Sequence, residues 1–585
     1  MLKMLKRFTK TEGLLIGLSL IFIVIQVWLD LKIPDYMSEV KMLVQTPGSE
    51  MRDIYVAGGL MLACAFGSLV SAVAVAVIAS KISANLGANL RSAMFNKVMD
   101  FSMEEMSRFS TDSLITRSTN DITQVQMLIV MGLQAIIKAP IIGVWAILKI
   151  ADKSWQWTFT TAMAIVILMA VVGILMFLAL PKFKSLQALT DRLSSVTREN
   201  LSGLRVVRAY NAEDYQEDKF EAVNTELTNT HLFTSRAMAF MQPSIQLVMS
   251  GLSLAIYWIG AILIEQATMP MKLTLFSDMI VFSSYAMQIV MAFMMLIMIF
   301  ILVPRASVSI NRIQEVLETD LAITDGGMSA SSRAEVGQVE FKNVSFKYPG
   351  AQEYVIRDVS FKANQGETVA FIGATGSGKS TLINLIPRLY EATEGEVLVN
   401  GMNVKDYNLD ALHNTMGYVS QKAQLFNGTI KSNVAYGNNG HDGFIDSDII
   451  EAIYTAQASD FVEALEGGYD AKVTPGGTNL SGGQKQRISI ARAIARQAKI
   501  LIFDDSFSAL DYRTDKKLRQ ALREDCADAT KLIVAQRIGT IKDADRIIVL
   551  DEGRVVGNGT HDELMANCLE YQEIAYSQLS KEELA

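Results

Sequence analysis

Cysteine and excess positive charge are both scarce in this sequence. Its 585 residues contain three cysteines, Cys64, Cys526 and Cys568, whose separations fit neither a disulfide framework nor a zinc site. The formal net charge is −8, which provides no basic footprint for nucleic acid. We therefore expect a protein without structural disulfides or zinc and without a nucleic-acid partner.

Charged residues are also rare in six long stretches of the first half of the chain. Each stretch stays apolar over about 20 residues, the length that crosses a bilayer. No small-residue cleavage site follows the first stretch, so it is interpreted as a span and not as a signal peptide. The pattern predicts a polytopic α-helical membrane domain of six spans within residues 1–303. The predicted spans are residues 13–33, 54–80, 127–150, 157–180, 242–264 and 276–303.

Basic residues mark one side of this membrane domain. They gather in residues 1–10 and in two long connections, 81–126 and 181–241, whereas the other connections are short. The positive-inside rule therefore predicts that both termini and the long connections are cytoplasmic. The long connections keep a helical periodicity, so we expect cytoplasmic extensions of the spanning helices.

Two features inside the spans stand out. Lys138 is ionisable, which is costly in a span unless the group faces a cavity or a partner. A substrate-cavity or inter-helix role and a snorkelling or packing role are both open for it. A methionine stripe on the last span suits an adaptable apolar cavity, although lipid-facing packing fits its spacing as well. The stripe comprises Met287, Met291, Met294, Met295 and Met298.

The second half has the pattern of an α/β domain. A linker is predicted over residues 304–336, where Gly and Ser are frequent between 324 and 332. From Val339 onwards, strand patterns alternate with helical ones. This alternation predicts a domain with a parallel core sheet over residues 337–585.

A phosphate-binding loop lies near the start of this domain. Residues 373–381 read GATGSGKST and follow an apolar strand pattern at 368–372. They fit G-x-x-x-x-G-K-[ST], in which glycines let backbone N–H groups approach a polyphosphate. In this pattern Lys379 reaches the β and γ phosphates and the Ser380 hydroxyl holds Mg²⁺. The predicted nucleotide contacts are Gly373, Thr375, Gly376, Ser377, Gly378, Lys379, Ser380 and Thr381.

Further motifs follow in a characteristic order. They are FKYP with Tyr348, YVSQ with Gln421, LSGGQ at 480–484, ILIFD ending at Asp504, and SALD at 508–511. The set resembles the motifs of ATP-binding-cassette (ABC) exporters, and the whole chain is similar to their type IV half-transporters, with six helices ahead of one nucleotide-binding domain. Segments 110–121 and 199–213 look like the coupling loops of that family.

The resemblance implies roles for individual residues. Tyr348 would stack on adenine, Gln421 would reach Mg²⁺ from the Q-loop, and Asp504 would bind Mg²⁺ through water as the Walker B acid. ATP and Mg²⁺ are the expected cofactors. The LSGGQ motif at 480–484, called the signature below, would bind the γ-phosphate of an ATP held by a second subunit. Its binding residues would be Ser481, Gly482, Gly483 and Gln484.

Two positions depart from the family pattern. Asp505 stands where the family has a glutamate as general base, and Gln536 stands in place of the switch histidine. The aspartate side chain is one methylene shorter, and a misplacement of about 1 Å can cost on the order of 100-fold in rate. Glutamine can donate a hydrogen bond but cannot become a cation. We expect a degenerate site that binds ATP and hydrolyses it slowly; the alternative is neutral drift, with Asp505 still a competent base.

A second half-transporter is the partner that the resemblance implies. The chain resembles the subunit of heterodimeric bacterial multidrug exporters that carries the degenerate site, and its intact signature would complete the partner's competent site. The expected function is ATP-driven export of amphipathic small molecules or lipid-like substrates across a bacterial plasma membrane, in contact with membrane lipids. A homodimeric lipid or peptide exporter and a non-transporting ATP-binding regulator are the alternatives.

Overall fold

The computed structural model describes residues 9–46, 48–151, 154–328, 336–437 and 443–578. Most of the basic N-terminal segment and residues 329–335 of the predicted linker therefore lie outside the described residues. The chain divides into two compact units. The first comprises Met1–Val98 and Asp112–Thr319, and the second comprises Met99–Thr111 and Asp320–Ala585.

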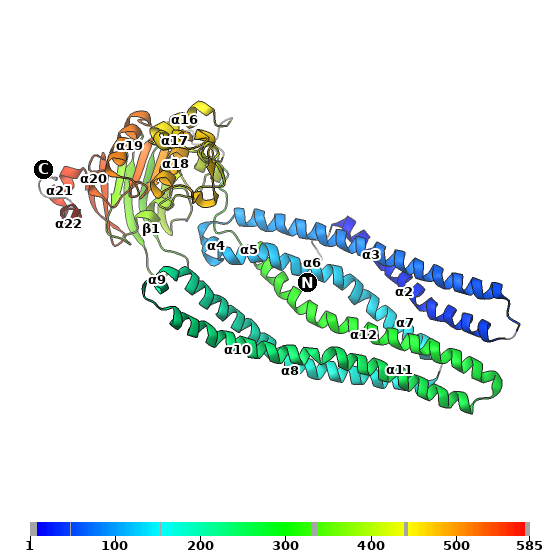
Figure 1. Ribbon diagram of the computed structural model, residues 1–585. Helices are drawn as coiled ribbons and strands as arrows, with labels where there is room; N and C mark the ends of the chain where they lie inside the picture. Colours follow the sequence, from blue (N-terminus) through cyan, green and yellow to red (C-terminus); the bar gives the residue numbers. More distant parts are fainter. Residues whose placement is uncertain (1–8, 47, 152–153, 329–335, 438–442, 579–585) are drawn as a thin grey trace. The chain divides into compact units, whose positions relative to one another are not determined.

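The first unit consists of long helices that lie side by side (Figure 1). Within the described residues, six helices are long and apolar enough to cross a membrane, which confirms the six predicted spans. The helices continue well beyond the roughly 20 residues that a bilayer needs. The elements are α2 (Lys10–Gln45), α3 (Met51–Met99), α5 (Thr111–Thr116), η1 (Arg117–Asp121), α6 (Ile122–Gly132), η2 (Leu133–Lys138), α7 (Ala139–Ala151), α8 (Trp155–Ser202), α9 (Leu204–Ala209), α10 (Glu213–Ala239), α11 (Met241–Gln266) and α12 (Met269–Leu317).

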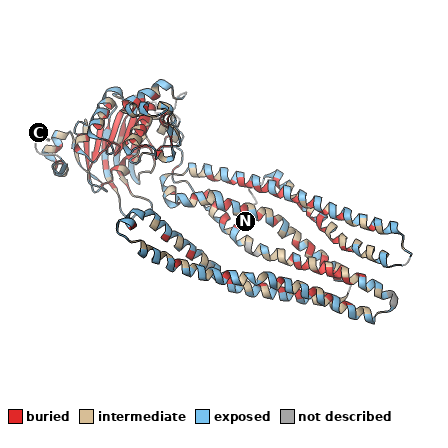
Figure 2. Ribbon diagram, viewed as in Figure 1, coloured by how far each residue is buried: buried red, intermediate tan, exposed pale blue. Residues whose placement is uncertain are grey.

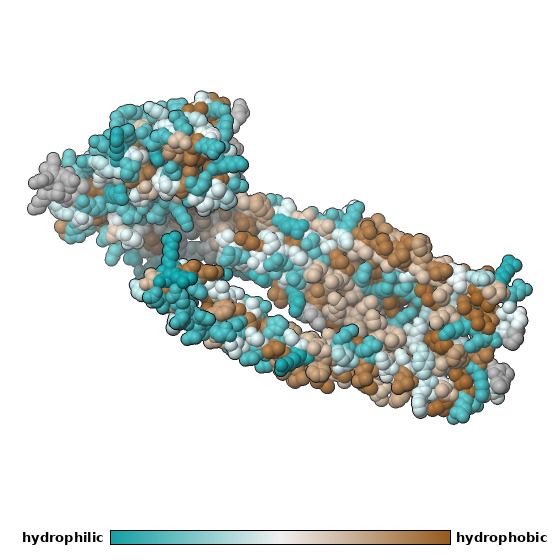
Figure 3. Space-filling view, in the orientation of Figure 1, coloured by the Kyte–Doolittle hydropathy of each residue, from teal (hydrophilic) through white to brown (hydrophobic). Residues whose placement is uncertain are grey.

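The surface of this unit is suited to lipid. Figure 2 shows that many positions on its helices are exposed, and Figure 3 shows hydrophobic side chains over much of their length. Leu62, Phe66 and Phe177 are among the most exposed large apolar side chains. Apolar surface on this scale is unusual for a protein in water but normal for helices that face hydrocarbon, where their backbone groups are satisfied internally.

The third spanning helix is continuous but contains two π-helical turns, η1 and η2. Arg117 of η1 forms an ion pair with Glu315 of α12 at 2.7 Å, and Asp121 forms one with Arg312 at 3.4 Å. Single π-helical turns are rare and are often found at functional sites. Lys138 ends η2 and lies 3.3 Å from Asp30 of α2, so the lysine has an inter-helix partner.

Short helices follow the long ones in both long connections. Segment 199–213 contains α9 between α8 and α10, and segment 110–121 contains α5 and η1. The chain just before the latter, with α4 (Met103–Arg108), belongs to the second unit, where the Glu105 carboxylate accepts a hydrogen bond from the Ala322 backbone N–H at 2.5 Å. Helix α12 runs on to Leu317, so the first part of the predicted linker continues the last helix.

The second unit is the predicted α/β domain. A six-stranded sheet has the order β12-β11-β3-β10-β9-β6, and all its pairs are parallel except β11 with β12. A four-stranded antiparallel sheet has the order β2-β1-β4-β5. The strands are β1 (Val339–Phe346), β2 (Ile356–Ala363), β3 (Thr368–Ile372), β4 (Glu394–Val399), β5 (Met402–Asn403), β6 (Met416–Val419), β7 (Gly428–Thr429), β8 (Lys472–Val473), β9 (Ile500–Asp504), β10 (Thr530–Val534), β11 (Arg546–Asp551) and β12 (Arg554–Gly559).

The parallel sheet is buried on both faces, as parallel sheets usually are. Along β3, Ala370 and Ile372 join one apolar cluster, whereas Val369 and Phe371 join another. The buried strands stand out in Figure 2. The helices of this unit are α13 (Lys379–Asn384), α14 (Leu409–Asn414), α15 (Ile430–Val434), α16 (Asp446–Thr455), α17 (Ser459–Ala464), η3 (Gly468–Asp470), η4 (Pro475–Gly477), α18 (Gly482–Ala495), α19 (Tyr512–Asp525), α20 (Ile538–Ile541), α21 (His561–Asn567) and α22 (Leu569–Gln578).

Candidate functional site

The register of the parallel sheet brings distant parts of the sequence together. Val534, the last residue of β10, pairs with Phe371 of β3 on one side and with Asp504 of β9 on the other. On the far side of β9, Phe503 pairs with Val419, the last residue of β6. The segments that follow these strands therefore leave the sheet at one edge, where open α/β sheets bind ligands.

The phosphate-binding loop begins directly after β3. Gly373 permits a close approach, because a Cβ atom there would lie 2.0 Å from the Leu550 carbonyl oxygen. Gly378 has a φ of +94° and caps the N-terminus of α13. Its left-handed conformation favours glycine and turns the chain into the helix. Thr375 and Gly376 are exposed, and Ser377 is buried.

Lys379 is held by the loop itself. Its ammonium group donates to the carbonyl oxygens of Gly373 and Ala374 at 2.9 and 2.7 Å, and it lies 3.3 Å from the Ser377 hydroxyl. Burial lowers the pKa of Lys379, and the carboxylates of Asp505 and Asp504 oppose this effect. Carbonyl oxygens hold a cation without neutralising it, so the ammonium can pair with phosphate oxygens that enter the loop.

An oxygen-donor pair lies beside the loop. The Ser380 hydroxyl donates to Asp504 Oδ1 at 2.6 Å, which places a hydroxyl and a carboxylate side by side at the start of α13. Burial raises the pKa of Asp504, and the hydrogen bond from Ser380 opposes this rise. Hard oxygen ligands of this kind fit Mg²⁺, which also takes water and phosphate oxygens as ligands. Gln421 is not part of this pair, because its side-chain amide points to Asp505.

The carboxylate of Asp505 is held by two amides. Gln536 Nε2 donates to Asp505 Oδ2 at 2.8 Å, and Gln421 Nε2 donates to the same oxygen at 3.3 Å. Asp505 has a left-handed backbone, with a φ of +47°, and its carbonyl oxygen accepts from the Ser508 hydroxyl at 2.9 Å. Burial raises the pKa of Asp505, and the hydrogen bond from Gln421 opposes the rise. The two departures from the family pattern, Asp505 and Gln536, are therefore in direct contact.

An aromatic cluster surrounds Tyr348, the predicted adenine contact. The Tyr348 hydroxyl and the Thr381 hydroxyl lie 2.8 Å apart, which ties the ring to the end of the phosphate-binding loop. The Tyr348 ring meets Phe346 and Tyr390 edge to face, with centroids 5.0 and 5.3 Å away. A cavity of about 490 Å³ adjoins this cluster. Flat apolar rings beside an open space are suited to stacking on a nucleobase.

The signature lies at the start of α18. Ser481 is the N-cap residue, and Ser481 and Gln484 form a reciprocal capping box. Ser481 and Gly482 are exposed, and Gly483 and Gln484 are partly buried. Among the described residues, no hydrogen bond joins the signature to the phosphate-binding loop. The signature therefore leaves a helix N-terminus exposed at Ser481 and Gly482.

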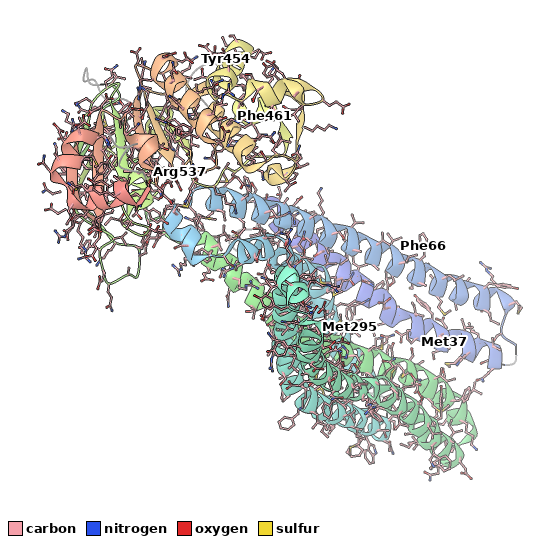
Figure 4. All side chains as sticks on the ribbon, turned by 60° about the vertical axis from the view of Figure 1, so that its left-hand side comes forward. Met37, Phe66, Met295, Tyr454, Phe461 and Arg537 are labelled. Atoms are coloured by element: carbon pink, nitrogen blue, oxygen red, sulfur yellow. The ribbon has the colours of Figure 1, made fainter. Side chains whose placement is uncertain are left out.

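The sequence did not predict that Gln578 would hold the segment around Gln536. Gln578 of α22 donates from Nε2 to the Gln536 carbonyl oxygen at 2.7 Å and accepts from the Ile538 N–H at 2.9 Å. Arg537, labelled in Figure 4, donates to the Ser508 carbonyl oxygen at 3.4 Å. No sequence pattern marks a glutamine 42 residues from the segment that it holds.

The membrane unit contains a cavity of about 610 Å³. Three residues of the methionine stripe line it, Met287, Met291 and Met295, whereas Met294 and Met298 do not. Asp30, the partner of Lys138, is also a lining residue. The methionine stripe therefore lines the cavity only in part.

Comparison with known proteins identifies the two halves separately. The protein-family model of the ABC transporter transmembrane region matches residues 14–317, and the family model named ABC transporter matches residues 356–508. An uncharacterised ABC transporter ATP-binding protein of Mycobacterium tuberculosis is 39% identical over 521 residues, which cover 89% of this chain and 87% of the relative. The uncharacterised ABC transporter ATP-binding protein YfiB of Bacillus subtilis is 34% identical over 578 residues, or 98% of both chains.

The chain is also similar to a relative with a named activity and to a solved structure. The ATP-dependent lipid A-core flippase of Pseudomonas aeruginosa is 32% identical over 491 residues, which cover 83% of this chain and 79% of the flippase. The solved structure of a bacterial Atm1-family ABC exporter with ATP bound has a TM-score of 0.77 and covers 98% of both chains at 22% identity. The latter shows that the two proteins share a fold.

Proposed function

This chain belongs to the ABC transporter family as a multi-pass membrane exporter half with a nucleotide-binding domain, and we propose that it is the slow-site subunit of a heterodimeric exporter. The observation that carries the proposal is the 2.8 Å hydrogen bond from Gln536 to Asp505. It joins the two residues that differ from the family's general base and switch histidine. In this proposal the site binds ATP and hydrolyses it slowly.

The binding residues of the site are complete. Lys379 and the backbone of residues 373–378 bind the β and γ phosphates, and Tyr348 stacks on the adenine ring. Ser380 and Asp504 would hold Mg²⁺, with Gln421 as a further ligand once its amide leaves Asp505. When bound, the metal ion neutralises charge on the phosphate oxygens. The 2.6 Å contact between Ser380 and Asp504 supports this assignment, because both oxygens already lie together.

The residues at the general-base and switch positions are poorly suited to hydrolysis. A general base must reach the attacking water directly, and Asp505 has one methylene fewer than glutamate. Its Oδ2 atom also accepts hydrogen bonds from two amides, so its lone pairs are engaged by Gln536 and Gln421. Gln536 donates a neutral hydrogen bond where a histidine could become a cation. Both effects act against positioning and activation of water, while they leave the phosphate-binding contacts intact.

The signature supports a two-chain assembly. Ser481 and its neighbours lie at the N-terminus of α18 without a hydrogen bond to the loop of their own chain among the described residues. In the proposed heterodimer they contact the ATP on the partner's phosphate-binding loop. The partner supplies a glutamate and a histidine at that site, so one site is fast and the other is slow. The slow site then keeps ATP bound and favours contact between the nucleotide-binding domains.

The transport assignment follows from the membrane unit and the relatives. We place both termini in the cytoplasm of a bacterial cell, because basic residues gather in the N-terminal segment and the two long connections, and six spans return the chain to its starting side. The similarity to a lipid A-core flippase supports lipid-like or other amphipathic substrates. The methionine-lined cavity supports the same class, because flexible thioethers adapt to apolar molecules of different shapes.

ATP turnover of the chain alone and of the assembled pair tests this proposal. The full-length chain is purified in lipid nanodiscs by itself and, in parallel, with a half-transporter that has glutamate and histidine at the two altered positions. We expect turnover to rise by about 100-fold in the pair, because only the pair contains a correctly positioned base. Equal turnover by the chain alone would favour a homodimeric exporter. Slow turnover with every such partner would favour a non-transporting regulator.

A further inference from the structure

One charged residue lines the cavity in the membrane unit. Its volume of about 610 Å³ lies in the range that suits a small organic molecule. Residues of α2, α7, α11 and α12 line it, and Figure 4 labels Met37 of α2 and Met295 of α12. Asp30 is the single charged residue among the described lining residues, and no basic residue lines the cavity within that part of the chain.

The counter-ion of Asp30 is not among the residues that line the cavity. Lys138 Nζ is 3.3 Å from Asp30 Oδ2, and Lys138 itself does not line the cavity. The side chain of Asp30 is 26% exposed and that of Lys138 is 17% exposed, so the carboxylate is the more accessible partner. The pair therefore forms a dipole with its negative end toward the cavity. A cation that enters meets this negative end first, whereas an anion is repelled by it.

The pair leaves the carboxylate with capacity for a further partner. Charge-assisted N–H···O bonds are usually about 2.7–2.9 Å long, so a separation of 3.3 Å describes a loose contact. The Ser68 hydroxyl donates to the other carboxylate oxygen. A carboxylate has about four acceptor sites, and these two neighbours use only some of them. Asp30 can thus accept a hydrogen bond from a ligand while Lys138 and Ser68 hold it in place.

A second potential hydrogen-bond acceptor belongs to a residue that lines the same cavity. Gln288 lines the cavity, and its Oε1 atom is buried without a hydrogen-bond partner among the described residues. A buried acceptor that lacks a donor is costly, so the side chain gains a hydrogen bond when it turns its amide oxygen toward a ligand N–H group in the cavity. The remaining wall is largely apolar and rich in methionine, and its polarisable sulfur atoms tolerate a soft organic cation.

We propose that Asp30 selects for positive charge in this cavity, so that the transported molecule is an amphipathic organic cation, held more tightly when its charged nitrogen bears N–H groups. Lys138 and Ser68 are positioning residues that orient the carboxylate. The N–H groups of a protonated amine would also reach Gln288. This inference rests on the proposed export function, because it names the class of substrate that the membrane unit would carry.

Two ions of one shape and opposite charge test the selectivity. Binding of tetraphenylphosphonium and tetraphenylborate is measured by equilibrium titration of the full-length protein in nanodiscs, with any partner that copurifies, after subtraction of protein-free nanodiscs. We expect the cation to bind at least about 10-fold more tightly than the anion. We expect Asp30→Asn/Lys138→Gln, which removes both charges, to weaken cation binding about 10-fold. Asp30→Glu keeps the charge and should retain binding.

A second ion pair, whose aspartate also lies on α2, provides the control. Asp35 and Lys149 lie 2.8 Å apart but do not line the cavity, so Asp35→Asn/Lys149→Gln should leave cation binding within about two-fold. Gln288→Leu should weaken binding of 1-naphthylmethylammonium but not of its N,N,N-trimethyl derivative, which has no N–H donor. Equal binding of the two tetraphenyl ions, or equal effects of the two double variants, would overturn the inference.

The binding assay also separates this inference from the export proposal. Ion binding is measured without nucleotide, so it does not depend on which site hydrolyses ATP. Selective cation binding without any partner-stimulated turnover would support the role of Asp30 and contradict export. Fast turnover in the pair without charge selectivity would support export and contradict the role of Asp30.

Discussion

The Asp505→Asn variant of this chain, assembled with a wild-type partner, is expected to keep ATP turnover within about two-fold of wild type. Replacement of the partner's general-base glutamate by glutamine is expected to lower turnover by about 100-fold or more, in the range that a lost general base usually costs. The difference arises because the Asp505 side chain is one methylene shorter than glutamate and its Oδ2 atom already accepts hydrogen bonds from Gln536 and Gln421. Turnover is measured as phosphate release by the purified pair.

Asparagine is a suitable replacement at this position because it keeps the size of the side chain. A thermal unfolding measurement controls for folding, and ATP binding to this chain should be retained because Lys379 and Ser380 are unchanged. If Asp505→Asn and the partner variant lower turnover equally, Asp505 is a working base and the site is not degenerate.

The signature of this chain is expected to matter more for turnover than its own general-base position. We expect Ser481→Arg to lower turnover of the pair by about 100-fold or more, because a bulky cation at the start of α18 blocks the helix N-terminus that contacts the partner's ATP. Ser481 caps α18, so loss of the cap should also lower stability by about 1 kcal/mol. Phosphate release and a thermal unfolding curve together separate these effects.

The control for the signature variant is ATP binding by the same chain. Within the described residues the signature makes no hydrogen bond to the phosphate-binding loop, so the variant should bind a fluorescent ATP analogue at its own loop as wild type does. Lys379→Ala, by contrast, should weaken binding of the analogue to this chain. Unchanged turnover of the Ser481→Arg pair would show that the signature does not serve the partner.

Local patterns in the sequence predict the fold well. Six apolar stretches indicated the spanning helices, because each is long enough to cross a bilayer without charge. The phosphate-binding loop was recognisable because its glycines, lysine and serine lie within nine residues. Alternating strand and helix patterns also predicted the parallel sheet, whose register then brings Asp504, Asp505 and Gln536 to one edge.

Contacts between distant residues could not be predicted in the same way. The partner of Lys138 is Asp30, 108 residues earlier, and nothing in the spacing of either helix indicates that their side chains meet. The contact depends on how α2 packs beside η2, which only the folded structure shows. The same holds for Gln578, because its two hydrogen bonds to the Gln536 segment depend on the docking of α22. The split of the methionine stripe likewise depends on helix packing.

The central claim is that Asp505 and Gln536 make this chain's own ATP site slow, and repair of that site tests it most directly. Single-site turnover is measured in a pair whose partner carries the glutamate-to-glutamine change, so that only this chain's site can work. We predict slow turnover with the wild-type chain and a gain of about 100-fold with Asp505→Glu/Gln536→His, which restores the reach of the base and a titratable switch. Turnover by the wild-type chain as fast as that of the double variant would contradict the account.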